Sequence, residues 1–235
     1  LRNRIIWCFL FLIFSFCFFF YFSDYVAKIL INPLFSLSEN SNEKRMIFTG
    51  LPEVFISNLK ISLFAAFLFS LPFFIIQLFF FISPALYKKE KRFFLPILSF
   101  IPLLFILGLI FCYFFLIPVI WKFFLSFENF IDGSFSVELE SRYSEYMKLT
   151  MYLLFSCGLS FLFPIFLIIL TKFKVLSIEQ LKTNRKYFMI GILIFSAIFT
   201  PPDIISQIGI AIPLLIFYEF SILFIKIFTK DKKNA

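Results

Sequence analysis

The sequence predicts an all-α membrane protein with six transmembrane helices, because its composition, its uncharged runs and the placement of its basic residues agree. Hydrophobic residues make up 61% of the 235 residues and charged residues 15%, and the mean hydropathy is +0.98. Such a chain has too little polar surface to cover a water-soluble globule. We therefore expect one integral membrane domain over residues 1–235.

Uncharged windows mark four long spans, and two consecutive prolines divide the remaining apolar stretch into two more. The expected helices cover about 5–23, 61–86, 93–119, 148–171, 187–201 and 204–228. The stretch from Tyr187 to Pro202 would rise about 24 Å against a hydrocarbon core of about 30 Å, so short fifth and sixth helices are expected. One kinked helix over both is the alternative. No small-residue cleavage site follows the first span, which predicts a retained anchor and no removable signal peptide.

Basic residues gather in alternate loops, and acidic residues lie in the others. The basic groups are Arg2 and Arg4; Lys88, Lys89, Lys91 and Arg92; Lys172, Lys174, Lys182, Arg185 and Lys186; and Lys226, Lys230, Lys232 and Lys233. By the positive-inside rule both termini face the cytoplasm, or the matrix or stroma of an organelle. The net charge of +8 is therefore a topology signal, and no nucleic-acid partner is expected.

The two longer loops on the acidic side, 26–55 and 122–146, contain many helix-forming residues but are too polar to insert. We expect short amphipathic capping segments there, on the outer side of the membrane. Pro33 and Pro52 are expected to break these segments.

Residues for catalysis or metal binding are scarce. The chain has no histidine, only 6 glycines and no glycine-rich phosphate loop. Its cysteines, Cys8, Cys17, Cys112 and Cys157, stand singly in apolar runs and are expected to be packing residues. The sequence thus predicts no enzyme, no catalytic residue, no metal and no cofactor.

A few polar residues interrupt the apolar runs. They are Gln77, Thr200, Asp203, Gln207 and Glu219. A charge within hydrocarbon costs roughly 2.5–3.5 kcal/mol on insertion scales, so these groups are functional candidates. The alternatives are that Asp203 caps a helix and that Glu219 reaches the interface or pairs with Lys226.

The motifs of this chain resemble those of the TatC component of the twin-arginine protein translocase, over essentially its whole length. The motifs are Leu1-Arg2-x-Arg4; Phe55-x4-Lys60-x-Ser62; Gln77-x3-Phe81-x2-Pro84-Ala85-Leu86-Tyr87-Lys88-x-Glu90-x-Arg92; Gly158-x-Ser160-Phe161-x2-Pro164; and Thr200-Pro201-Pro202-Asp203-x2-Ser206-Gln207-x3-Ala211-x-Pro213-x5-Glu219. The resemblance implies a receptor that binds twin-arginine signal peptides and exports folded proteins, driven by the protonmotive force. It implies TatA- and TatB-type single-span partners in an oligomeric complex.

The resemblance also implies site residues. Glu90, Phe81, Arg2 and Arg4 map to signal-peptide binding, with Glu90 the carboxylate for a guanidinium pair. Thr200 and Gln207 map to the site of a partner helix, and Asp203, Glu219 and Gln77 are functional polar residues of the membrane region. A second family carboxylate would stand just before Leu1. For Glu90, a solvated charge balancing its basic neighbours is the alternative.

One departure separates the chain from the family pattern. The family's fourth helix commonly carries a buried glutamate or glutamine where this sequence has Leu162 and Phe163.

The alternative functions are a proton- or ion-coupled small-solute transporter and a scaffold for membrane assemblies. The expected location is a bacterial plasma membrane or an organellar one, either mitochondrial inner or plastid thylakoid.

Overall fold

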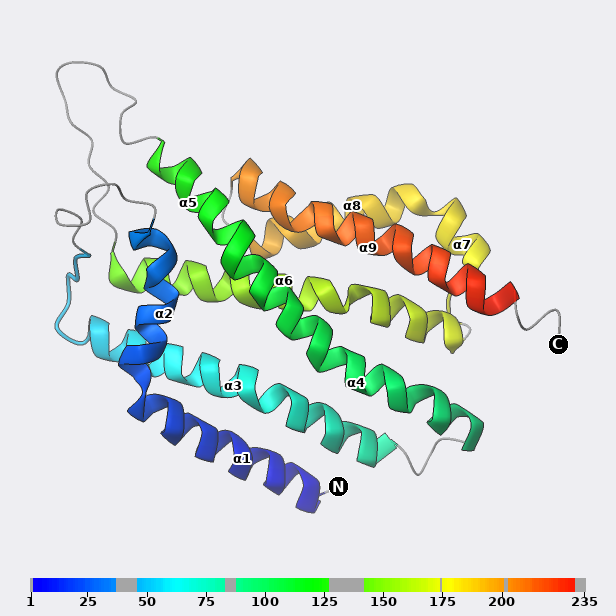
Figure 1. Ribbon diagram of the computed structural model, residues 1–235, viewed down its shortest axis with the longest axis horizontal. Coiled ribbons are helices and arrows are strands. Elements are labelled where there is room, and N and C mark those ends of the chain that lie inside the picture. Colours follow the sequence, from blue (N-terminus) through cyan, green and yellow to red (C-terminus); the bar gives the residue numbers. More distant parts are fainter. Residues whose placement is uncertain are drawn as a thin grey trace. The chain divides into compact units, whose positions relative to one another are not determined.

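Helices form nearly all of the described structure. The computed structural model describes residues 2–36, 46–82, 88–126, 142–173, 175–200 and 203–230. The helices in Figure 1 are α1 (Arg2–Tyr21), α2 (Ser23–Phe35), α3 (Glu53–Ile82), α4 (Lys88–Phe111), the π-helix η2 (Cys112–Leu116), α5 (Ile117–Leu125), α6 (Tyr143–Lys172), α7 (Ile178–Thr183), α8 (Arg185–Phe199) and α9 (Ile204–Lys230). Outside them, the described residues contain one isolated β-bridge, between Ile47 and Arg142. The predicted all-α class is confirmed.

Five helical segments within the described residues are long and apolar enough to cross a membrane. They are Arg2–Tyr21, Glu53–Phe81, Ser99–Leu125, Tyr143–Lys172 and Ile204–Lys226. Helix α8, where the short fifth span was expected, has 15 residues, about 22 Å at 1.5 Å per residue. Helix α9 has 27 residues and is therefore longer than expected for the sixth span. The six-span count and the orientation remain predictions.

Several helices extend beyond the uncharged windows that predicted them. Helix α3 begins at Glu53, eight residues before Ile61, and α4, η2 and α5 follow one another without interruption. Charge marks where hydrocarbon ends, whereas a helix continues for as long as its backbone hydrogen bonds and caps allow. The π-helix ends two residues before Pro118. A wider turn accommodates the proline ring, which would otherwise clash with the preceding helical turn.

The chain forms two compact units, and the first contains residues 1–102 and 117–151. Within it, α1 lies antiparallel to α3 (Figure 1). Ser70 Oγ donates a hydrogen bond of 3.3 Å to Ser15 Oγ, and the rings of Phe11 and Phe73 stack with centroids 4.5 Å apart. Among the residues of α1, Ser15 alone is buried. Ser62 Oγ of α3 also donates to the carbonyl oxygen of Phe19 of α1 at 3.4 Å, so these helices make contact through rings, one hydroxyl pair and this bond.

Helix α2 occupies part of the first predicted capping segment. Tyr146 Oη donates to the carbonyl oxygen of Leu30 at 2.9 Å, which holds α2 against the beginning of α6. Pro33 lies inside α2, so the expectation that it breaks this segment is wrong. A proline in the last turn removes only one helical amide, and the helix ends two residues later. Most of the second predicted capping segment, residues 127–141, lies outside the described residues.

The second unit contains residues 103–116 and 152–235. Its closest helix approach is at Gly108 of α4, where an added Cβ would lie 2.9 Å from the carbonyl oxygen of Cys157 and 3.0 Å from the Cα of Gly158. Only glycine allows the backbones of α4 and α6 to come this close. Small residues at such crossings are typical of helix packing in lipid.

Helices α8 and α9 form an antiparallel hairpin, so the single kinked helix is wrong. Gln207 Nε2 of α9 donates to the carbonyl oxygen of Leu193 of α8 at 3.2 Å. Helix α7 packs on α9, where buried Tyr218 donates its hydroxyl to the carbonyl oxygen of Leu181 at 2.6 Å. Helix α7 begins with a capping box between Ser177 and Gln180. Polar contacts therefore fix both ends of the hairpin within the second unit.

Candidate functional site

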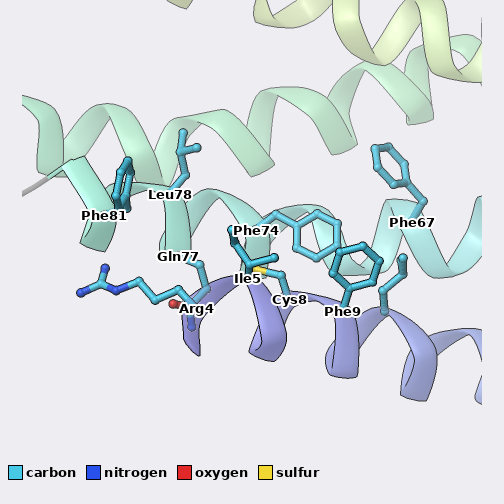
Figure 2. A pocket seen from close by; sticks show the side chains of 10 residues that line it. Arg4, Ile5, Cys8, Phe9, Phe67, Phe74, Gln77, Leu78 and Phe81 are labelled. Carbon is cyan, nitrogen blue, oxygen red and sulfur yellow. The ribbon is translucent and has the colours of Figure 1, made fainter. Parts of the chain in front are cut away.

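Three of the predicted site residues, Arg4, Gln77 and Phe81, line one groove in the first unit (Figure 2). The groove has a volume of about 410 Å³, and α1 and α3 supply its described walls. Its lining residues are Arg4, Ile5, Cys8, Phe9, Leu12, Phe67, Phe74, Gln77, Leu78 and Phe81. The antiparallel pairing brings the first turn of α1 to the last turns of α3, which places Arg4 near Phe81.

Arg4 is the charged group of this groove. Its guanidinium carbon lies 5.9 Å from the centre of the Phe80 ring, a cation–π distance. Its Nη1 is buried and has no hydrogen-bond partner among the described residues. Phe81 is 51% exposed, so its ring is available to a bound molecule. The arrangement suits a partner that is apolar along most of its length and carries an acceptor at one end.

Glu90 and Arg2 complete the predicted signal-peptide set. Arg2 is the first residue of α1 and is exposed. Glu90 is the third residue of α4, and its side chain lies outside what the structure describes. Only residues 83–87 separate α3 from α4. Glu90 therefore comes shortly after Phe81 in the sequence, and Phe81 lies at the end of the groove.

The turn between α8 and α9 holds the second predicted site, within the second unit. Thr200 is buried, and its Oγ1 donates to the carbonyl oxygen of Ser196 at 2.9 Å. Asp203 Oδ2 accepts from the backbone N–H of Ser206 at 2.7 Å, which confirms that Asp203 caps α9. Its Oδ1 and the Oγ of Ser206 are buried and have no hydrogen-bond partner in the described part of the chain. Gln207 already uses its amide on Leu193.

Glu219 pairs with Arg185, and not with Lys226, which was the pairing considered as an alternative to a functional role. Arg185 Nη2 lies 3.0 Å from Glu219 Oε2, and both side chains are partly exposed. The sequence held a signal for this pair that was missed. Arg185 lies 15 residues before Thr200 and Glu219 lies 16 residues after Asp203, so an antiparallel hairpin that turns between Thr200 and Asp203 brings the two together.

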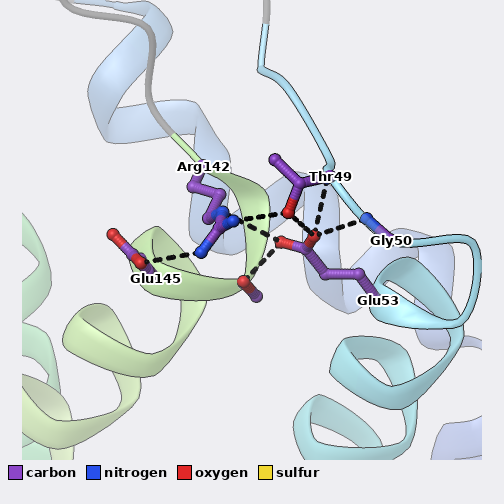
Figure 3. Close-up of polar contacts among 6 residues, drawn as sticks. Thr49, Gly50, Glu53, Arg142 and Glu145 are labelled. Atoms are coloured by element: carbon purple, nitrogen blue, oxygen red, sulfur yellow. Dashed lines mark hydrogen bonds and ion pairs between the residues drawn. The ribbon is translucent and has the colours of Figure 1, made fainter.

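Glu53 forms the centre of a polar cluster that sequence reasoning missed (Figure 3). Its Oε2 accepts from the backbone N–H groups of Thr49 at 2.8 Å and Gly50 at 3.3 Å, and its Oε1 accepts from Ser144 Oγ at 2.5 Å. Arg142 lies 4.0 Å from the same carboxylate and donates to Thr49 Oγ1 at 2.5 Å. The cluster ties the segment before α3 to the beginning of α6. Neither Glu53 nor Arg142 stands in a local sequence motif, so the sequence did not predict this long-range contact.

The cysteines and the membrane polar groups offer no catalytic arrangement. No group of three or more His, Cys, Asp or Glu side chains within the described ranges could hold a metal ion. Cys112 and Cys157 are buried as packing residues, whereas Cys17 is exposed. On α6, Ser156 and Ser160 lie near the position where the family's buried polar residue was expected. Ser160 donates to a carbonyl of its own helix at 2.7 Å.

Comparisons with known proteins show which family the chain resembles in sequence and fold. The family model for TatC, the Sec-independent protein translocase protein, matches residues 1–213. The Sec-independent protein translocase protein TatC of Rickettsia prowazekii is 41% identical over 212 residues, 90% of this chain and 83% of the relative. The protein of the same name from Desulforapulum autotrophicum is 35% identical over 234 residues, 100% of this chain and 84% of the relative. A crystal structure of the twin-arginine translocase receptor TatC matches with a TM-score of 0.78 at 34% identity and covers 97% of each chain.

Proposed function

The chain belongs to the TatC family of Sec-independent protein translocase proteins, and we propose that it is the subunit that binds the twin-arginine signal peptides of exported proteins. The resemblance predicted from the motifs is confirmed, and the protein is a multi-pass integral membrane protein. As a family member it is a component of a translocase complex and is not an enzyme. In this proposal, the protonmotive force drives folded cargo proteins across the membrane.

One observation supports the signal-peptide site above the others. Arg4, Gln77 and Phe81, from positions far apart in sequence, line one groove, and the chain passes from its end directly to Glu90. A carboxylate recognises guanidinium groups through short, charge-assisted, forked hydrogen bonds. In this proposal Glu90 binds the arginine pair and Phe81 contacts apolar side chains of the peptide. Arg2 and Arg4 repel arginines, so their role is to orient the acidic groups of the site.

The turn between α8 and α9 is proposed as the site of a TatA- or TatB-type helix. Asp203 Oδ1 and Ser206 Oγ are buried, have no hydrogen-bond partner among the described residues, and lie close in sequence to Thr200 and Gln207. A partner helix that donates to Asp203 would satisfy such an atom, and hydrogen bonds between helices in lipid contribute about 0.6–2 kcal/mol. The exposed apolar face of α8, which includes Ile194 and Ile198, would extend the contact.

The decisive variant for the receptor role is Glu90→Ala. Loss of a charge-assisted hydrogen bond costs about 1.5–3 kcal/mol, so crosslinking of a twin-arginine signal peptide to the membrane-inserted variant should fall by about tenfold or more. Photo-crosslinking with the peptide at a subsaturating concentration measures this directly.

Glu179→Ala is the matched control, because Glu179 is an exposed carboxylate of α7 that maps to no signal site. This control should crosslink like the unmodified protein. Equal crosslinking by the Glu90 and Glu179 variants would exclude the assignment of Glu90. A peptide with two lysines in place of the arginines should bind more weakly, because an ammonium group cannot form the forked pair.

A further inference from the structure

Arg4 is a charged side chain with a donor that has no acceptor among the described residues. Its Nη1 is buried without a hydrogen-bond partner in the described structure, although the guanidinium also contacts the Phe80 ring. A buried charged donor without an acceptor is unfavourable, because the donor loses its hydration without replacement. The described lining of the groove offers Gln77 and Cys8 as further polar groups and contains no carboxylate. An acceptor from outside the described residues would satisfy this donor.

The remaining walls of the groove are apolar and open outward. Phe9 is 62% exposed and Leu78 61% exposed, so the groove is accessible from the side of the helix pair. Both helices of its wall are long and apolar enough to span a membrane. From Arg4 to Leu12 the helix rises about 12 Å, which is less than half of a hydrocarbon core of about 30 Å. The groove thus has the depth of one lipid leaflet.

We propose that this groove binds an anionic phospholipid of the membrane. A phosphate oxygen accepts a hydrogen bond from Arg4 Nη1, and one acyl chain lies along Phe9, Leu12 and Phe74. The charge pattern of the sequence places this end of α1 on the cytoplasmic side, whose leaflet carries anionic lipids and attracts basic residues. The positive charge of Arg4 favours a phosphate over the arginines of a signal peptide. The lipid would occupy the groove that the proposed signal-peptide site also includes, so lipid and peptide would compete there, but the proposal does not depend on Glu90.

Tryptophan quenching by brominated lipids tests this proposal in the full chain. Trp7 and Trp121 are the only two tryptophans of the sequence and are replaced by phenylalanine, after which Phe74→Trp places one reporter in the groove. The protein is reconstituted in vesicles with brominated phosphatidylglycerol or brominated phosphatidylcholine of matched chains. Phosphatidylglycerol has a net negative charge, whereas the choline ammonium of phosphatidylcholine offsets its phosphate. A basic residue near an anionic surface gains about 1 kcal/mol, so we expect roughly fivefold tighter binding of the anionic lipid at the reporter.

Variants of Arg2 and Arg4 distinguish a specific lipid site from a general electrostatic attraction of anionic lipid to basic residues. Arg4→Gln should reduce the preference to about onefold, and Arg4→Lys should retain part of it. Arg2→Gln is the charge-matched control and should leave the preference intact, because Arg2 is exposed and does not line the groove. A reporter at Phe14, which is 70% exposed on α1 and outside the groove, should show equal quenching by both lipids.

Four results would overturn the proposal. The Phe74 reporter could show no headgroup preference, or the preference could survive Arg4→Gln. Excess inorganic phosphate could abolish the preference, which would identify a free anion as the ligand. A twin-arginine peptide could protect the reporter equally from both lipids, which would assign the groove to the peptide. If Phe74→Trp does not fold, Leu78→Trp reports on the same groove.

Discussion

The α1–α3 pair of the first unit and the helices of the second unit associate through different kinds of contact. Both sets are highly apolar and must associate where lipid competes for every apolar surface. The α1–α3 pair uses phenylalanine rings, the Ser15–Ser70 hydroxyl pair and a longer hydrogen bond from Ser62 to the carbonyl oxygen of Phe19. The second unit uses close backbone contact at Gly108, the amide of Gln207 and the ion pair of Arg185 with Glu219.

The difference shows what fixes a helix pair in lipid. Apolar side chains gain little by leaving lipid for one another, so close packing and hydrogen bonds determine register. The second unit has both kinds of contact at defined positions. The α1–α3 pair has few of them and leaves an open groove beside Arg4. We infer that the first pair adapts to a bound molecule more readily than the second.

The largest effect that separates the two regions is expected at Gly108. An alanine Cβ there would lie 2.9 Å from the carbonyl oxygen of Cys157, so two backbones would have to separate. Overpacking of this kind costs typically about 1–3 kcal/mol. Gly108→Ala should lower the midpoint of thermal unfolding in detergent micelles by several degrees, measured by the surviving monodisperse fraction after heating.

Gly191→Ala is the control for this substitution. No atom lies within 4 Å of an added Cβ at Gly191, and alanine favours the helix, so this variant should be unchanged or slightly more stable. Equal midpoints for both variants would show that close approach at Gly108 does not stabilise the second unit. The contrast drawn between the two regions would then fail.

Much of this fold follows from local sequence signals. Uncharged length identified the long spans, and Pro201 with Pro202 marked the hairpin, because a proline pair removes the amides that a continuous helix needs. Asp203 was recognisable as a helix cap because it directly follows the proline pair, and in the structure its carboxylate accepts the free N–H of Ser206. Such signals act within one or two helical turns, so they can be read from a single sequence.

The contacts that were missed connect distant parts of the chain. Glu53 and Arg142 lie far apart in sequence, and no local pattern brings them together. The Arg185–Glu219 pair was predictable from the positions of the two residues about the hairpin turn, yet only Lys226, which is nearer in sequence, was considered as a partner of Glu219. For Glu90 the sequence identifies the residue through a motif, while its role in binding remains a proposal.

An intermediate effect is expected for the ion pair of the hairpin. Both side chains are partly exposed, 47% for Arg185 and 44% for Glu219, so the coupling free energy should be about 0.5–1 kcal/mol. A double-mutant cycle with Arg185→Gln and Glu219→Gln measures it from thermal midpoints. The exchanged pair, Arg185→Glu with Glu219→Arg, should recover most of the loss. A cycle between Glu219 and Lys226 is the control and should give no coupling. A larger coupling of Glu219 to Lys226 than to Arg185 would contradict the Arg185–Glu219 ion pair.

The smallest effect is expected at Ser70, in the α1–α3 pair. Ser70→Ala removes the hydrogen bond to Ser15, and double-mutant cycles on such bonds in lipid average about 0.6 kcal/mol. Ser160→Ala is the matched control, because the hydroxyl of Ser160 is also buried but bonds to its own helix. Crosslinking between cysteines placed at Phe11 and Phe73 should weaken only in the Ser70 variant. Because this pair has few other specific contacts, even this small loss should loosen it. Unchanged crosslinking would mean that the stacked rings and the bond from Ser62 to Phe19 hold α1 on α3 without the Ser15–Ser70 pair.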